Sequence, residues 1–133
     1  MARSKYGKYI IKEPVAPGFQ VERLQTLNID SPCTIFCQAI KEPALMIKDT
    51  HKHDFHQLLC FMGGNPLDIR DFGAEIELSL GEEGEKHIID TTTIVNIPAG
   101  LPHCPLNFKK IEKPIVFLEI MLAGKYEKHI VKE

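Results

Sequence analysis

Hydrophobic residues recur along most of the chain in short runs, and turn-forming residues separate these runs roughly every ten positions. The runs are rich in Ile, Val, Phe and Thr, which favour a pleated, half-buried strand. Many short strands at even spacing are typical of an antiparallel sandwich or barrel. The pattern therefore predicts an all-β domain with strands at 34–40, 44–48, 53–62, 74–80, 86–89, 93–97 and 115–122.

The same pattern predicts where the domain begins and ends. Residues 1–30 are expected to form an N-terminal extension that packs on the barrel, because Pro14 and Pro17-Gly18 mark turns there. Residues 31–124 are expected to form the barrel, and residues 125–133 a C-terminal tail. The total of 133 residues fits one domain that can bury a core without disulfides.

Helical sequence is scarce. One helical turn is expected at 65–68, where Asn65 can cap the turn and Pro66 stands at the first helical position.

Composition narrows the classes of partner. Hydrophobic residues make up 44% and charged residues 26% of the chain, as in ordinary globular proteins. A net charge of -2 provides no strong field for nucleic acid or for an anionic membrane. No apolar run approaches the roughly 20 residues of a membrane span, and no apolar region of a signal peptide follows the basic start. We therefore expect a cytoplasmic protein with neither a nucleic-acid nor a membrane partner.

Four cysteines would be reduced in that compartment, namely Cys33, Cys37, Cys60 and Cys104. None forms a C-x-x-C pair, and the simplest interpretation is that they are small buried hydrophobic residues. A zinc site built on Cys33 and Cys37 is an alternative, although their spacing is not that of the usual zinc knuckles.

Two short histidine clusters are the clearest chemical signal in the chain. The first contains His51 and His53, with Gln57 following, and residues two apart on a strand share one face. The second contains His103, which follows the turn Pro98-Ala99-Gly100 and can meet the first cluster across a barrel. Three imidazoles and one side-chain oxygen suit one divalent transition metal, which could be Fe, Mn, Ni, Co, Cu or Zn.

These clusters give the chain a resemblance to the cupins over about residues 31–124. The first cupin motif reads G, five residues, H-x-H, three or four residues, E, six residues, G. His51, His53, Gln57 and Gly64 match this motif, except that Gln57 replaces the usual glutamate. Leu45 stands where the motif opens with glycine, and we expect an adjusted turn there.

The second cupin motif reads G, five residues, P-x-G, two residues, H, three residues, N. Pro98, Gly100, His103 and Asn107 match it, and Asn107 is expected to hold the turn after His103. Thr92 replaces the opening glycine, again at an expected turn. Either motif alone is a weak signal, but both in the right order on a β-rich background are a strong one.

The resemblance implies a small single-domain cupin, an all-β double-stranded β-helix (jelly-roll or cupin barrel) with an N-terminal extension. It implies a metal held by His51, His53, Gln57 and His103, and pairing of two chains as a homodimer. An amide in place of the carboxylate removes a negative charge, so we expect weaker metal binding and a more electron-poor metal.

Alternatives to this ligand set stay open. His56 is a rival fourth ligand if a bulge shifts the strand register, and Gln57 could instead be only a hydrogen-bonding group beside the metal. All of these histidines could also be ordinary core or surface residues of a barrel that lost its metal. His87 and His129 lie among charged residues and are expected to be solvated.

Three glutamates lie on predicted strands. Glu75 and Glu77 share one strand face, which would be a solvated outer face in most proteins but could offer a general base if it faced inward. Glu119 is the lone carboxylate of an apolar strand, where it would pair with a lysine or form hydrogen bonds in the pocket.

The sequence thus predicts metal-dependent oxygenation, decarboxylation or isomerisation of a small polar or anionic organic molecule bound in the barrel. The enzyme would be a metal-dependent dioxygenase, decarboxylase or isomerase, and no residue is singled out as its catalytic base. The alternative is a binding or sensor module that captures a small ligand without chemistry, since barrels of this kind host many functions.

Overall fold

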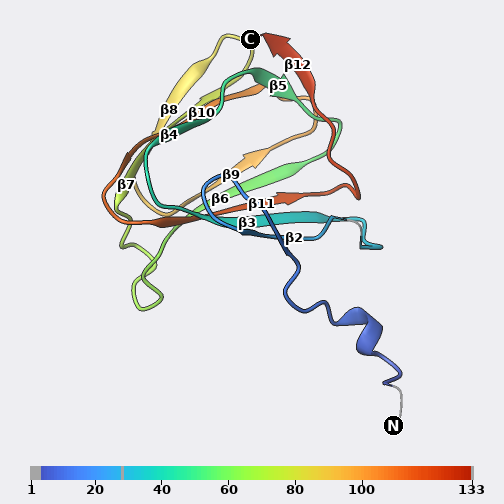
Figure 1. Cartoon of the computed structure of the whole chain (residues 1–133). Coiled ribbons are helices and arrows are strands. Elements are labelled where there is room, and N and C mark those ends of the chain that lie inside the picture. The colour runs from blue at the N-terminus through green and yellow to red at the C-terminus, as the bar shows by residue number, and fades with distance from the viewer. Residues whose placement is uncertain (1–3, 28, 133) are drawn as a thin grey trace.

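Two antiparallel sheets of six strands each face one another in the computed structural model, which describes residues 4–27 and 29–132 (Figure 1). The first sheet has the order β1 (Val15–Ala16), β2 (Arg23–Gln25), β3 (Thr34–Ile40), β11 (Ile115–Met121), β6 (Gln57–Gly63) and β9 (Thr93–Ile97). The second has the order β12 (His129–Lys132), β5 (Thr50–Lys52), β10 (His103–Ile111), β7 (Ala74–Leu80) and β8 (Glu85–Ile89), and β4 (Ala44–Ile47) also pairs with β10. The predicted all-β fold is confirmed.

Alternation of side chains builds the core between the sheets. In β3 every second residue is buried, from Thr34 to Ile40. Phe61, Phe108 and Phe117 are 0–1% exposed, and their ring centroids lie 5.0–6.3 Å apart. Full burial of one such side chain contributes about 1.5–3 kcal/mol, so this aromatic cluster is a main source of the barrel's stability.

The expected strand 53–62 starts too early: its first four residues form a bend, and the strand itself begins at Gln57. β5 ends at Lys52 and β6 begins at Gln57, with a bend between them. The carbonyl oxygen of His53 accepts a hydrogen bond from the amide of Gly100 (2.8 Å). This carbonyl is therefore used by a loop contact instead of a sheet ladder, and the chain can turn from the second sheet to the first.

Strand β10 was not predicted. Pro105 lies within it, and proline cannot donate to a sheet ladder. The pairing of β10 with β7 shifts register between His103 and Leu106, which accommodates the missing donor. Asn107 lies inside this strand, opposite Glu77, so its expected place in a turn is wrong.

Three smaller expectations also need correction. Leu45 lies in β4, not in a turn, whereas Thr92 does lie in a bend. Residues 65–68 form a turn and no helix, in which the side-chain oxygen of Asn65 accepts a hydrogen bond from the amide of Leu67 (3.0 Å). A short 3-10 helix, η1 (Gly7–Tyr9), was not predicted.

Both chain ends contribute strands. Within residues 1–30, β2 pairs with β3 and extends the first sheet, while the segment that carries η1 projects away from the two sheets (Figure 1). Within residues 125–133, β12 pairs with β5, which carries His51. The C-terminal strand therefore lies next to an element that carries the candidate site, whereas the N-terminal strands extend the first sheet beyond β3. The described residues include no helix with the length and hydropathy that a bilayer crossing requires.

Candidate metal centre

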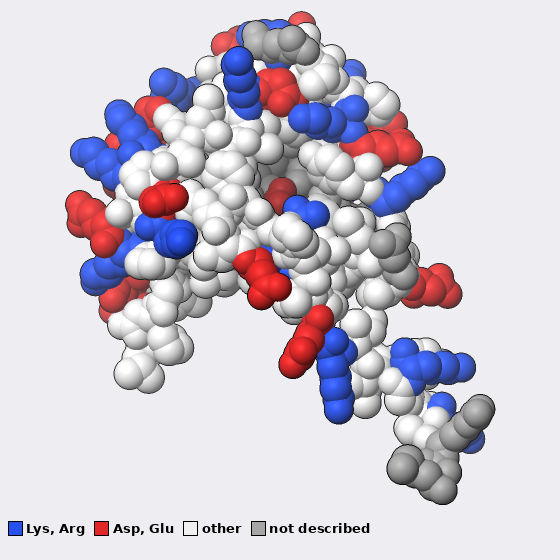
Figure 2. Space-filling view, viewed as in Figure 1, with Lys and Arg blue, Asp and Glu red and all other residues white. Residues whose placement is uncertain are grey.

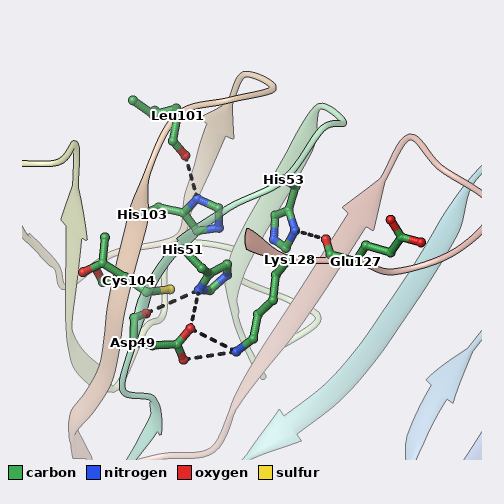
Figure 3. Close-up of polar contacts among 9 residues, drawn as sticks. Asp49, His51, His53, Leu101, His103, Cys104, Glu127 and Lys128 are labelled. Carbon is green, nitrogen blue, oxygen red and sulfur yellow. Dashed lines mark hydrogen bonds and ion pairs between the residues drawn. The ribbon is translucent and has the colours of Figure 1, made fainter. Parts of the chain in front are cut away.

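Three buried histidines meet inside the barrel. His51 lies on β5, His53 follows that strand directly, and His103 opens β10 opposite His51. Their exposed fractions are only 2–3%. The ring centroids lie 4.5–5.2 Å apart, and one ligand atom from each ring lies within 4.8 Å of the others (Figure 3). The rings are close enough together to bind one metal ion.

A turn joins the two histidine motifs. The amide of Leu101 bonds to the carbonyl oxygen of Pro98 (3.1 Å), and Gly100 has a φ of 85°, which favours glycine. The amide of Gly100 donates to the carbonyl of His53, as described above. This contact fixes the segment that leads into His103 against the segment that carries His53.

Each imidazole is oriented through its Nδ1 atom (Figure 3). His53 Nδ1 donates to the carbonyl oxygen of Glu127 (2.5 Å), and His103 Nδ1 donates to that of Leu101 (3.0 Å). His51 Nδ1 lies 3.3 Å from the carbonyl oxygen of Asp49 and 3.4 Å from its carboxylate. Because a carbonyl oxygen only accepts, each Nδ1 carries the proton and each Nε2 keeps its lone pair, the tautomer of most metal-ligating histidines.

Burial keeps these imidazoles neutral. It lowers the pKa of His51 and His53 below the usual value and lowers the pKa of His103 to about 4, although the hydrogen bonds at Nδ1 oppose the shift. Near neutral pH no proton needs to leave before Nε2 can bind a cation.

Asp49 supports His51 from behind. Burial acts to raise the pKa of Asp49. The pKa nevertheless stays below its ordinary value, because the carboxylate accepts hydrogen bonds from Lys128 and from its own backbone and lies near the charges of Lys128 and His51. Lys128 Nζ lies 3.1 Å from both carboxylate oxygens. An ionised Asp49 therefore stands behind the His51 ring, where it would balance part of a cation's charge.

Two buried polar atoms at this site have no hydrogen-bond partner among the described residues: Nε2 of His53 and Oε1 of Gln57. Gln57 is 2% exposed and lies at the start of β6. An unpaired buried polar atom is costly, and most native structures avoid it. A bound cation would give both atoms a partner, so the donor set fits a metal ion.

The other histidines lie elsewhere. His56 is partly exposed and its Nε2 contacts Oδ1 of Asn96, away from the buried cluster. His87 and His129 are about half exposed, as expected, and they contact the carboxylates of Glu85 (2.6 Å) and Asp54 (3.0 Å).

The cysteines and two of the glutamates also have clear positions. The cysteines are free thiols, with Cys60 and Cys104 buried and the other two partly buried, so the interpretation as small core residues holds best for the first pair. Glu75 and Glu77 each lie 3.7 Å from the amine of Lys109, on the face of β7 opposite the buried Ile76 and Leu78.

Glu119 faces the barrel interior. It lies on the same face of β11 as the buried Phe117 and Met121, which are two residues away on either side. Burial raises its pKa to about 7, with the positive charge of Arg23 acting in the opposite direction. It lines a narrow space of about 20 Å³ beside His51, Gln57 and His103, large enough for about one water molecule.

Tyr126 lines the same narrow space, and its ring centroid lies 5.1 Å from that of His53. Sequence reasoning missed this residue because it lies in the expected tail. A single tyrosine in a polar segment carries no signal of its own; only the pairing of β12 with β5 brings it to the site.

Known structures share this architecture. An uncharacterized conserved protein with a double-stranded β-helix domain from Klebsiella pneumoniae matches all of this chain and 99% of its own, with a TM-score of 0.60 and 12% identity. The capsular polysaccharide assembling protein CapF from Staphylococcus aureus matches 90% of this chain and 32% of its own, with a TM-score of 0.57 and 8% identity. Oxalate decarboxylase from Bacillus subtilis matches 80% of this chain and 26% of its own, with a TM-score of 0.51 and 16% identity.

No family model matches the sequence, and no curated protein matches it either. The structural likeness nevertheless shows the fold, a double-stranded β-helix.

Proposed function

We propose that this chain, which has the cupin fold, binds one divalent transition metal through His51, His53, His103 and Gln57 and acts on a small polar or anionic organic molecule. The observation that carries the proposal is a set of four buried side chains: three imidazoles held by their Nδ1 atoms, and Gln57. Among the described residues, Nε2 of His53 and Oε1 of Gln57 have no hydrogen-bond partner. We infer a metal-dependent oxygenation, decarboxylation or isomerisation. When bound, the metal would act as a Lewis acid toward the substrate or toward a bound water.

The residues around the metal would orient the substrate and restrict water. The aromatic rings of Phe55 and Tyr126 pack on His53, at 4.5 and 5.1 Å between centroids. Glu119 is the carboxyl group that lines the narrow space beside the histidines, and it could hold or accept a proton from a substrate there. The likeness to oxalate decarboxylase supports a small organic acid as substrate, although 16% identity carries over no specific reaction.

Metal content is the direct test. Elemental analysis of freshly purified protein should give one transition metal per chain, and the double variant His51→Ala, His103→Ala should lose it. The double variant His87→Ala, His129→Ala removes two exposed histidines and should keep the metal. Equal metal content in the two variants would contradict the proposed site.

The alternative is a binding or sensor module without chemistry. A binding module would have the same metal site as the enzyme. It would bind a small acid, but the acid would be recovered unchanged. Incubation of the metal-loaded protein with small organic acids, followed by mass spectrometry of the mixture and measurement of oxygen uptake, separates the two functions.

We also propose that the chain works as a homodimer. The segment that projects from the body carries exposed apolar side chains, with Tyr6, Tyr9 and Ile10 at 63%, 70% and 67% exposure. Exposed apolar groups of this size gathered in one segment are typical of a contact with another protein surface.

A further inference from the structure

A second cavity, of about 500 Å³, adjoins the narrow space beside the histidines. Ile47, Glu119 and Tyr126 line both spaces, so the larger cavity leads toward the candidate metal centre. Figure 2 shows this face of the molecule hollowed, with charged side chains of both signs around the opening. Its volume is in the range of cavities that take small organic ligands.

The wall of this cavity is held in place by the N-terminal segment. Gln38, which is 6% exposed, accepts a hydrogen bond from the amide of Phe19 through its side-chain oxygen (2.8 Å). At Gly18 an added Cβ atom would lie 2.2 Å from the carbonyl oxygen of Val21, so only glycine fits this turn. These contacts hold the loop at 17–19 against the wall of the cavity.

Arg23 is the one cationic side chain that lines the cavity among the described residues. Its guanidinium group lies 4.1 Å from the ring centroid of Phe36, and its Nε donates to Oε1 of Gln25 (3.0 Å). Within the described part of the chain, no carboxylate lies within ion-pair distance of it. Stacking fixes the plane of the group and leaves its terminal N–H donors for a ligand, and this planar pair of donors matches a carboxylate.

Much of the remaining lining is apolar, and Phe36 lies between Arg23 and Tyr126, with its ring centroid 4.1 Å from the guanidinium group and 6.4 Å from the Tyr126 ring. Phe19, Leu27, Phe36 and Met46 form this apolar part, while Glu119 and Tyr126 provide polar atoms at the end near the histidines. An occupant that fits this arrangement has a carboxylate at one end, an apolar body and a hydroxyl or carbonyl group at the other.

We propose that this cavity binds a small carboxylic acid of that kind, with its carboxylate on Arg23 and its second oxygen function beside Glu119 and Tyr126. That the hydroxyl or carbonyl group of the acid comes close to a metal rests on the proposed function. The recognition of the acid by Arg23 rests on the cavity alone.

Calorimetric titration with a matched pair of probes tests the inference. The acid 3-(4-hydroxyphenyl)propanoate has all three features, and its primary amide has nearly the same shape but is neutral and carries an NH2 group in place of one carboxylate oxygen. The acid should bind the protein at least about tenfold more tightly than the amide. The variant Arg23→Gln should remove this preference, and Arg23→Lys should keep part of it. Arg70→Gln, which removes an exposed arginine that does not line the cavity, should leave the preference unchanged.

Equal affinity for acid and amide, no acid binding at millimolar concentration, or a preference that survives in a folded Arg23→Gln variant would each overturn the inference. The titration is run on both metal-free and metal-loaded protein. A preference for the acid in a protein that takes up no metal supports the cavity and contradicts the metal site. Stoichiometric metal without any preference for the acid supports the metal site and contradicts the acid-binding cavity.

Discussion

Gln57 places a neutral amide among the buried donors, where the cupin motif usually has a glutamate. If its Oε1 binds the metal, Gln57→Glu adds a negative charge to the site and should tighten metal binding by at least about tenfold. Gln57→Ala removes the donor and should weaken binding. Competition with a coloured chelator measures both affinities.

The control for this residue is His56→Ala, since the His56 ring contacts Asn96 of β9 and not the buried histidines. Its metal affinity should equal that of the unaltered protein. Affinities that fall in His56→Ala and stay constant in both Gln57 variants would make His56 the fourth ligand.

Glu119 should give the metal-free protein an unusual dependence of stability on pH. Its pKa is about 7 when folded against 4.5 for the free side chain, so between these values the unfolded chain ionises and the folded chain does not. Its contribution to stability is therefore lost as pH rises from 4.5 to 7. His103 acts in the opposite direction, because its pKa falls from 6.5 to about 4, and its contribution is lost as pH falls through that range.

Glu119→Gln removes one of these two opposing effects. The free energy of unfolding of this variant is measured by urea titration and compared with that of the unaltered metal-free protein. The difference, variant minus unaltered, should rise by about 1–3 kcal/mol from pH 4.5 to pH 7. Glu77→Gln, on the outer face of β7, controls for the loss of one negative charge. A constant difference between Glu119→Gln and the unaltered protein over this range would show that the carboxyl group is not shielded from water.

At the scale of elements, the turn before β10 sets the position of His103. Gly100 and Gly84 both have a positive φ, 85° and 69°, and neither has an atom within 4 Å of the place where a Cβ would lie. Each substitution by alanine should therefore cost a similar amount, about 1–2 kcal/mol, for backbone strain alone. Alanine keeps the N–H group, but a shift of the backbone away from a φ of 85° would move the Gly100 amide from the carbonyl of His53, so only Gly100→Ala should also weaken metal binding.

Thermal unfolding and chelator competition on the pair Gly100→Ala and Gly84→Ala separate these two effects. Loss of metal affinity in both variants, or in neither, would mean that the turn does not position the histidines.

Strands with regular alternation were predictable, and those that depend on distant contacts were not. Thr34–Ile40 and Ala74–Leu80 were expected with the bounds that the structure has. Pro105 concealed β10, because its missing N–H argues against a strand unless a register shift accommodates it. The bend between Lys52 and Gln57 depends on a hydrogen bond to Gly100, which local sequence cannot reveal.

At the scale of the whole molecule, the histidine cluster follows from the motifs, but its surroundings follow from the chain ends. His51, His53 and His103 carry a motif that can be recognised in sequence. Arg23 and Tyr126 carry none, and they reach the site only because β2 extends one sheet and β12 pairs with β5 in the other. The lining of the cavity beside the site could therefore not be predicted from the sequence, since segments interpreted as an extension and a tail supply part of it.

The projecting N-terminal segment predicts how two chains would associate. Tyr9 and Ile10 are 70% and 67% exposed on a segment that contacts little of its own barrel (Figure 1), and burying them against a second copy would remove apolar surface from water. Light scattering should give twice the chain mass of 15.1 kDa, and the double variant Tyr9→Asp, Ile10→Asp should give a single chain.

The double variant Leu67→Asp, Ile69→Asp is the matched control, because these side chains are 94% and 65% exposed but lie in the turn after β6. It should remain a dimer if the projecting segment forms the interface. If only this control variant dissociates, the dimer interface lies at that turn and not at the projecting segment. A single-chain mass for the unaltered protein would leave the apolar side chains of the segment without a partner copy, and the homodimer would be wrong.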